Sequence, residues 1–290
     1  MNITPVILTL NEEPNIEATL SSLAWAREIV VVDSGSSDRT AEIARSFAGV
    51  RWFARKFDSH AEQWSFGFHG TDIDTRYVLA LDADMRPGPG FVEELARFTE
   101  LAVQTRVLDC QVAPGAGHSP AGRPGSALPE GTGAGRRPVQ AALVPFEYRV
   151  QGRPLLGSIY PAQIRVFEKD TVEIAQRGHT QVFRSAAPPY RFRSKLIHED
   201  RKPFSRWVVN QLQYASLEAE RIRTAPAQSF RDRLRRVGIS PAIWGAYAYL
   251  RAGGPFKGRA SRAYAEERVV FEALLARLLA GPEPASRIPS

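Results

Sequence analysis

Four short apolar segments, separated by helical patterns, constrain what the first hundred residues can fold into. Their β-branched content predicts strands at Ile3–Thr9, Glu28–Asp33, Val50–Ala54 and Tyr77–Leu81. Helices are expected between them, one from Pro14 to Leu23 and another that begins near Asp38. Strands joined by helices form right-handed crossovers and a mostly parallel sheet, with ligands at the carboxyl ends of the strands. The sequence therefore predicts a Rossmann-like α/β domain.

Two carboxylates, Asp82 and Asp84, follow the fourth predicted strand with one residue between them. Residues two apart on a strand share a side, so the two charges converge. A hard divalent ion with oxygen ligands would relieve their repulsion, which predicts an Asp-x-Asp site for Mn²⁺ or Mg²⁺. The alternative is a turn in which both side chains cap backbone amides before Pro87.

Short polar side chains also follow the first two strands. The turns at residues 9–14 and 33–40 offer hydroxyl, amide and carboxylate groups that suit a base and a ribose. Neither the glycine-rich dinucleotide fingerprint nor the P-loop sequence is present, so those two kinds of nucleotide site are excluded. Each turn alone could serve only to cap a helix.

These features together resemble the family 2 glycosyltransferases. The phrases that carry the resemblance are Leu8-Thr-Leu-Asn-Glu-Glu-Pro-Asn-Ile, Ile29-Val-Val-Val-Asp-Ser-Gly-Ser-Ser-Asp-Arg-Thr and Leu79-Ala-Leu-Asp-Ala-Asp. Residues 3–100 match closely and the likeness continues loosely to about residue 275. Arg165-Val-Phe167 and Pro255-Phe-Lys-Gly258 look like the branch that contains bacterial lipopolysaccharide-core β-glucosyltransferase-like proteins.

The resemblance implies an A-type sugar-nucleotide-binding fold, a divalent metal, and transfer with inversion at the anomeric carbon. It implies that Asn11, Glu13 and Asp33 contact the uracil or ribose, that Asp82 contacts the ribose or metal, and that Asp84 binds the metal. Other candidates for the nucleotide-sugar site are Thr9, Ser34, Gly35 and Gln63.

Inverting transfer needs a base that takes the proton of the acceptor hydroxyl. Relatives often carry His-Glu after the Arg165 segment, but here His179 is followed by Thr180 and Gln181, which are not bases at neutral pH. The candidates are therefore Glu199 and Asp200, with His179 as a substitute. Both carboxylates could instead start a helix and pair with neighbouring cations.

The rest of the chain changes character after a helix that begins near Gly90. Residues 111–140 hold 7 Gly and 5 Pro, which predicts a loop or a disordered insertion. Strand-like runs resume at residues 141–150 and 158–167, and helices are predicted at 205–222, 241–250 and 261–279. We expect a catalytic domain over residues 1–200, a helical extension over 201–280, and a flexible tail over 281–290.

The net charge of +7 is unevenly distributed. Residues 191–265 carry 16 Lys and Arg against 5 Asp and Glu, and residues 1–100 carry 9 against 16. The apolar segment 241–251 is flanked by arginines and is too short to span a bilayer, which suggests either an interfacial anchor or an ordinary packing helix. Without a signal-peptide pattern, we expect a cytoplasmic protein, either free or peripheral at the inner face of the cytoplasmic membrane.

The sequence thus predicts a metal-dependent glycosyltransferase that uses a nucleotide sugar, with UDP as the expected carrier. The acceptor would be a glycolipid, lipopolysaccharide or polysaccharide. The alternative is a catalytically silent nucleotide-sugar-binding or scaffold protein on the same fold. No nucleic-acid partner is expected, because the basic half lacks a recognised binding motif.

Overall fold

The computed structural model describes residues 1–112, 139–177, 180–224 and 229–281, and it describes their side chains except those of residues 105–112 and 177. Most of the glycine- and proline-rich segment that the sequence predicts as a loop therefore lies outside the described residues, as does His179.

A seven-stranded sheet forms the centre of the N-terminal two thirds, with the strand order β12-β6-β9-β4-β1-β2-β3. Its strands are β1 (Ile3–Thr9), β2 (Ile29–Asp33), β3 (Val50–Ala54), β4 (Tyr77–Asp82), β6 (Ala141–Val144), β9 (Gln163–Glu168) and β12 (Tyr190–Arg191). The neighbours β3, β2, β1 and β4 are all parallel, whereas β9 runs antiparallel to both β4 and β6. The predicted α/β fold with a mostly parallel sheet is confirmed.

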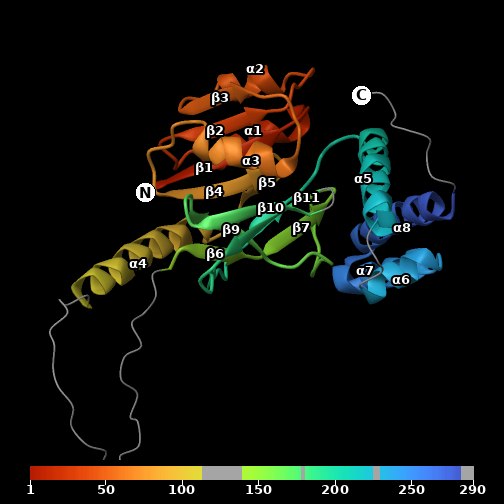
Figure 1. Cartoon of the computed structure of the whole chain (residues 1–290). Coiled ribbons are helices and arrows are strands. Elements are labelled where there is room, and N and C mark those ends of the chain that lie inside the picture. Colours follow the sequence, from red (N-terminus) through yellow and green to blue (C-terminus); the bar gives the residue numbers. More distant parts are fainter. Residues whose placement is uncertain (113–138, 178–179, 225–228, 282–290) are drawn as a thin grey trace, which may run out of the picture.

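Helices cover both faces of this sheet (Figure 1). One face packs against α1 (Glu13–Ser21), α2 (Thr40–Arg45) and α4 (Phe91–Val112). The other face packs against α3 (His60–His69) and the hairpin of β10 (Val172–Arg177) and β11 (Thr180–Ser185). Successive residues of a strand face opposite sides of the sheet. In β1, Val6 and Ile7 are accordingly both fully buried, each in a different one of these two cores. Such a sheet is apolar throughout because both faces are covered.

A smaller sheet, ordered β5-β13-β7-β8, brings the middle of the chain back to the end of β4. Its strands are β5 (Met85–Pro87), β7 (Phe146–Val150), β8 (Arg153–Pro154) and β13 (Leu196–His198). β13 pairs with β5 antiparallel, so that His198 lies opposite Met85, one residue beyond Asp84. The chain segment at 198–200 is thereby placed beside the predicted metal site.

Two strand predictions were wrong in extent. The run at 141–150 is divided at Pro145 into β6 and β7, which belong to different sheets. Proline lacks the N–H that a continuous strand needs, so the division is expected at that residue. The run at 158–167 becomes a strand only from Gln163, because residues 155–160 instead contact the C-terminal helices.

Among the described residues, five helical elements follow β13, and they confirm the predicted helical C-terminal region. They are α5 (Phe204–Thr224), α6 (Phe230–Arg236), α7 (Ser240–Ala252), the 3₁₀ turn η1 (Gly254–Lys257) and α8 (Arg259–Ala280). The sequence did not predict α6, which is short and rich in arginine. The domain boundary near residue 200 stays a prediction.

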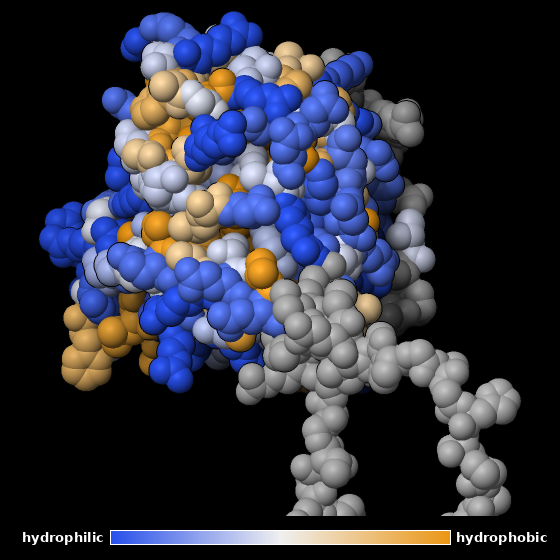
Figure 2. Space-filling view, turned by 90° about the vertical axis from the view of Figure 1, so that its left-hand side faces the viewer, coloured by the Kyte–Doolittle hydropathy of each residue, from blue (hydrophilic) through white to orange (hydrophobic). Residues whose placement is uncertain are grey.

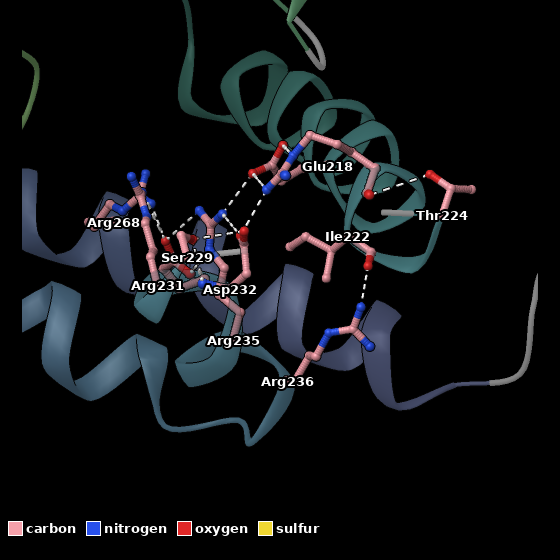
Figure 3. A network of polar contacts seen from close by, with 11 residues as sticks. Glu218, Ile222, Thr224, Ser229, Arg231, Asp232, Arg235, Arg236 and Arg268 are labelled. Atoms are coloured by element: carbon pink, nitrogen blue, oxygen red, sulfur yellow. Dashed lines mark hydrogen bonds and ion pairs between the residues drawn. The ribbon is translucent and has the colours of Figure 1, made fainter. Parts of the chain in front are cut away.

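A network of buried ion pairs joins α5, α6 and α8 (Figure 3). Arg235 contacts Glu218 at 2.7 Å and Glu272 at 3.0 Å, and Glu272 is also contacted by Arg231 and Arg268. Glu272 is fully buried, so its charge depends on these guanidinium groups for compensation. Burial raises the pKa of the Glu272 carboxyl, but its hydrogen bond with Arg235 and the neighbouring arginines outweigh this and lower it overall.

Within the described ranges, no helix is both long enough and apolar enough to cross a membrane. The face of the molecule shown in Figure 2, on the side away from α5–α8, is largely hydrophilic, with its apolar residues in small groups.

Candidate functional site

The site is assembled at the carboxyl ends of β4, β1 and β2. Register places Leu8 beside Asp82 and Thr9 beside Asp33, so the two predicted turns and the predicted metal site share one edge of the sheet. This is the edge at which open α/β sheets bind ligands.

Asn11 holds the turns after β1 and β2 together. Its backbone adopts a left-handed conformation, with φ of 55°, which asparagine tolerates better than most residues. Its side-chain Oδ1 accepts hydrogen bonds from the backbone N–H groups of Ser37 (2.7 Å) and Asp38 (3.3 Å). Gly35, with φ of 98°, supplies the second left-handed residue that this loop requires. The predicted nucleotide-site residues therefore lie in one preformed double turn.

Asp33 is the buried centre of this double turn. Its Oδ2 accepts the backbone N–H groups of Gly35 (2.9 Å) and Ser36 (2.8 Å), and its Oδ1 accepts the hydroxyl of Thr9 (3.0 Å). A carboxylate with this many donors fixes the conformation of the loop.

Gln63 and Glu13 lie at the margins of the same turn. The fully buried Gln63 donates to the hydroxyl of Ser34 at 3.0 Å and to the backbone carbonyl of Arg55 at 3.1 Å. Glu13 accepts the backbone N–H of Arg39 at 3.2 Å. The structure thus brings together all the nucleotide-site candidates, and their contacts with a ligand stay a prediction.

Asp82 is paired with a buried arginine. Nη2 of Arg165 donates to Oδ2 of Asp82 at 3.1 Å, and Arg165 itself projects from the antiparallel strand β9. Burial raises the pKa of the Asp82 carboxyl, but Arg165, His198 and His60 outweigh it and lower the pKa overall. Asp82 is therefore held as a carboxylate.

Asp84 differs from Asp82, because one of its oxygens has no partner. Its Oδ2 lies 3.5 Å from Nε2 of His198, whereas its Oδ1 is buried without a hydrogen-bond partner among the described residues. Burial, aided by Asp82 and Asp200, raises the pKa of the Asp84 carboxyl against the opposing effect of His198 and Lys202. A buried carboxylate oxygen without a donor needs either a proton or a cation.

The donor set around Asp84 suits a hard divalent ion in chemistry, with carboxylate oxygens and an imidazole nitrogen. The described residues nevertheless contain no group of three or more His, Cys, Asp or Glu side chains placed to share one ion. Arg165 occupies Oδ2 of Asp82 and leaves its other oxygen available, so Asp82, Asp84 and His198 are the residues that could bind a metal. Mg²⁺ in proteins commonly takes one or two carboxylates and completes its shell with substrate phosphates and water.

Lys202 joins the turn that follows β1 to the segment that follows β13. Its Nζ lies 2.7 Å from Oε1 of Glu12 and 3.4 Å from Oδ1 of Asp200. Asn15 contributes to the same junction, donating to Asp200 at 3.0 Å and accepting the backbone N–H of Arg201 at 2.9 Å. Burial raises the pKa of Glu12 to about 7, against the lowering effect of Lys202.

The three candidates for the base are placed differently. Glu199 is buried between Arg86 (2.6 Å) and Arg201 (3.0 Å), whose attraction outweighs burial and lowers the pKa of its carboxyl. Asp200 is more exposed and lies in the junction with Lys202, near Asp84. His179 lies outside the described residues.

Aromatic side chains lie beside His198, and a carboxyl group from α8 lies near Asp200. The ring of Tyr148 lies 4.6 Å from that of His198 and stacks on the exposed Tyr160 at 5.3 Å. Glu267 of α8 lies close enough to Asp200 for their charges to interact, and burial, followed by Asp200 and Glu266, raises its pKa to about 7. A carboxyl that titrates near neutral pH is a feature of catalytic sites and also of buried ion clusters.

Four residues near the site were not predicted from the sequence: Arg165, Lys202, Glu12 and Glu267. An arginine between two apolar neighbours in a predicted strand, Ile164 and Val166, was a usable signal for Arg165. Nothing local marks Glu267, which reaches the site through the packing of a helix far along the chain.

Residues 4–114 match the family described as glycosyl transferase family 2. This match confirms, over those residues, the family resemblance seen in the sequence; the narrower likeness to the lipopolysaccharide-core branch stays a prediction.

Solved structures of glycosyltransferases are similar at low identity. S. aureus TarS (residues 1–349, in complex with UDP-GlcNAc) is 11% identical, with 96% of this chain and 91% of that chain covered and a TM-score of 0.44. Glucosyl-3-phosphoglycerate synthase from Mycobacterium tuberculosis, in complex with phosphoglyceric acid, is 16% identical, with 75% and 77% covered and a TM-score of 0.37.

Proposed function

We propose that the chain, whose residues 4–114 match glycosyl transferase family 2, transfers a sugar from a UDP-linked donor to a glycolipid, lipopolysaccharide or polysaccharide acceptor, with inversion at the anomeric carbon. The observation that carries the proposal is Asp84. Its buried, unpartnered Oδ1 lies at the sheet edge where the two nucleotide-binding turns converge.

The donor would lie across the carboxyl ends of β1, β2 and β4. The double turn built by Asn11 and Asp33 is preformed, which lowers the entropic cost of binding a base and ribose. Asp82, kept ionised by Arg165, accepts hydrogen bonds from ribose hydroxyls in this arrangement.

Asp84 and His198 would hold a Mn²⁺ or Mg²⁺ ion, with the diphosphate supplying further oxygens. A bound divalent ion neutralises the charge that develops on the leaving diphosphate. The ammonium group of Lys202 lies close enough to Asp84 for their charges to interact. These residues orient the leaving group and stabilise its charge.

Asp200 is the base that the geometry favours. Glu199 is held between two guanidinium groups, which makes its carboxylate a weak proton acceptor. Asp200 lies near Asp84 and is held by Asn15 and Lys202 through its Oδ1. It would take the acceptor proton as the new glycosidic bond forms on the face opposite the diphosphate. His179 remains a further candidate from the sequence.

The acceptor is proposed to be linked to a lipid, which would place the protein at the inner face of the cytoplasmic membrane. The support is the basic C-terminal region of the sequence and the exposed aromatic side chain of Tyr160 beside the site.

A catalytically silent protein that only binds the nucleotide sugar is the second candidate. It is favoured by Thr180 and Gln181, which stand where relatives often carry a base. Turnover of a UDP-sugar distinguishes the two.

Thermal unfolding with UDP and UDP-sugars, with and without Mn²⁺, tests the proposal. A ligand at about 100 times its Kd adds roughly 2.7 kcal/mol to the free energy of unfolding, which is readily seen as a rise in Tm. We expect a rise that requires both UDP and Mn²⁺ and that disappears in Asp84→Asn.

Asp74→Asn is the matched control. Asp74 is an exposed carboxylate that precedes β4, at the opposite end of the strand from Asp84. The shift should be retained in this variant. Absence of any shift with UDP and Mn²⁺ in the unaltered chain would overturn the proposal.

A further inference from the structure

The outer face of α7 is apolar, and the residues that the structure describes leave it uncovered. Ile239, Ile243, Tyr247 and Leu250 recur at spacings of four, four and three residues, and all are exposed, Leu250 at 70%. These spacings place them in one stripe along a helix. The sequence from Val237 to Leu250 contains no charged residue, so no charge interrupts the stripe.

The inner face of α7 fixes this orientation. Gly245, Ala248 and Ala252 are buried, and a Cβ on Gly245 would lie 2.4 Å from Cγ2 of Val269 in α8. Small residues therefore allow α7 and α8 to approach closely. Rotation of α7 to bury its stripe would break this packing, so the stripe is a fixed part of the surface.

The apolar surface continues beyond the C-terminal end of α7. Phe256 of η1 is 89% exposed, and Leu156 is 64% exposed. Leu156 is joined to the end of α7 by a hydrogen bond from its N–H to the carbonyl of Ala252, at 3.1 Å. We call the four stripe residues together with Leu156 and Phe256 the α7 surface.

Positive charge predominates along the chain segment that contains α7 and η1. Residues 229–262 contain eight Lys and Arg and one acidic residue, Asp232, which is buried in an ion pair with Arg221. Five of the arginines are exposed, and they lie in the sequence on both sides of the stripe: Arg233, Arg236, Arg251, Arg259 and Arg262. A protein partner with mixed charge would find no exposed acid within this segment, whereas an anionic lipid surface complements all five cations.

The length of α7 determines how it could meet a bilayer. The helix has 13 residues. At about 1.5 Å per residue it is roughly 20 Å long, less than the hydrocarbon thickness of about 30 Å. A helix of this kind lies in the plane of the interface, with its apolar side chains among the acyl chains and its cations among the headgroups.

We propose that the α7 surface docks in the plane of an anionic lipid bilayer. The apolar stripe, Leu156 and Phe256 enter the boundary between headgroups and acyl chains, and the flanking arginines contact anionic headgroups. The apolar insertion and the electrostatic attraction act together, because each is weak alone.

The α7 surface is connected to the candidate site by the segment 155–160. The N–H of Ile159 donates to the hydroxyl of Tyr264 at 3.1 Å, and Tyr160 stacks on Tyr148, which lies beside His198. Docking through Leu156 would therefore bring the aromatic side of the site close to the lipid surface. This step rests on the proposed function, and it implies an acceptor anchored in the same bilayer.

Flotation of the full chain with vesicles tests the docking. We expect binding to vesicles that contain phosphatidylglycerol, little binding to pure phosphatidylcholine, and weaker binding as salt is raised. Ile243→Glu and Leu250→Glu, singly and together, should reduce binding at least tenfold. Arg233→Gln with Arg251→Gln should remove the preference for anionic lipid.

Val103→Glu is the matched control, because Val103 is an exposed aliphatic residue on α4, on the opposite side of the molecule (Figure 1). Its binding to vesicles should equal that of the unaltered chain. Failure of the unaltered chain to bind anionic vesicles at low salt overturns the proposal, as does an equal loss in Val103→Glu. The unaltered chain could instead form dimers that Ile243→Glu abolishes, and fail to bind vesicles. That result would assign the α7 surface to contact with a second copy of the chain.

The thermal shift with UDP and Mn²⁺ separates this proposal from the proposed function. Ile243→Glu should keep the shift, which also shows that the variant is folded. Vesicle binding without any thermal shift by nucleotide would support the docking and overturn the proposed transferase function. A thermal shift without vesicle binding would support the transferase function and overturn the docking.

Discussion

Nζ of Lys202 lies 2.7 Å from Oε1 of Glu12. This contact joins the turn after β1 to the segment that leads into the helical region. Both side chains are largely buried, at 8% and 14% exposed. A buried pair of this kind is costly to break, because removal of one partner leaves the other charge uncompensated.

Lys202→Met should therefore lower the free energy of unfolding by about 3 kcal/mol at pH 8, measured by urea denaturation. Without Lys202 the pKa of Glu12, already about 7, rises further. An acid whose pKa is raised in the folded state costs stability above its unfolded value and none below it, so the deficit should shrink towards pH 4. Lys195→Met, at an exposed lysine of the same segment, should change stability by less than about 0.5 kcal/mol. A deficit independent of pH would contradict this account.

Asp200→Asn tests the assignment of the base. We expect the rate of sugar transfer, or of the slow transfer to water, to fall by about 10²–10⁴ while the thermal shift with UDP and Mn²⁺ is retained. Glu199→Gln should instead reduce stability, since Arg86 and Arg201 lose their carboxylate. Release of UDP from UDP-sugars measures both variants, with the rate normalised to folded protein. A larger rate loss in Glu199→Gln than in Asp200→Asn would transfer the role to Glu199.

Glu267→Gln should change how stability depends on pH. Burial and the nearby Asp200 raise the pKa of Glu267 from 4.5 to about 7. The unfolded chain therefore loses this proton first, and stability falls as pH rises between these two values. Glutamine does not titrate and so removes that loss. The free energy of unfolding of the variant should therefore exceed that of the unaltered chain by on the order of 1 kcal/mol at pH 8 and by little at pH 4. Urea midpoints at the two pH values measure the difference, with Glu220→Gln, at an exposed position of α5, as the control.

The donor side of the site could be predicted from sequence because its signals are local. Thr9, Asn11 and Asp33 lie within one or two residues of the strands that position them, and the register of a parallel sheet brings those strand ends together. The order of strands and helices in the first hundred residues is predictable for the same reason.

The rest of the site depends on contacts between distant segments. Asn15 and Asp200 are 185 residues apart in the chain, and their hydrogen bond exists only after β13 has paired with β5. Sequence patterns report the period of an element and not its partner, so Lys202, Arg165 and Glu267 carried no sign of their neighbours. The division of strands at Pro145 was a readable signal, because proline cannot donate within a strand.

The charge network of the C-terminal helices determines where the chain can be cut. Glu272 lies in the last helix, and three arginines from two helices converge on it: Arg231, Arg235 and Arg268. A fragment that ends between residues 268 and 271 would keep all three cations and lose the carboxylate that they share. The helical region is therefore indivisible for fragment design: a shortened protein must retain α8 beyond Glu272 or omit the whole helical region from α5 to α8.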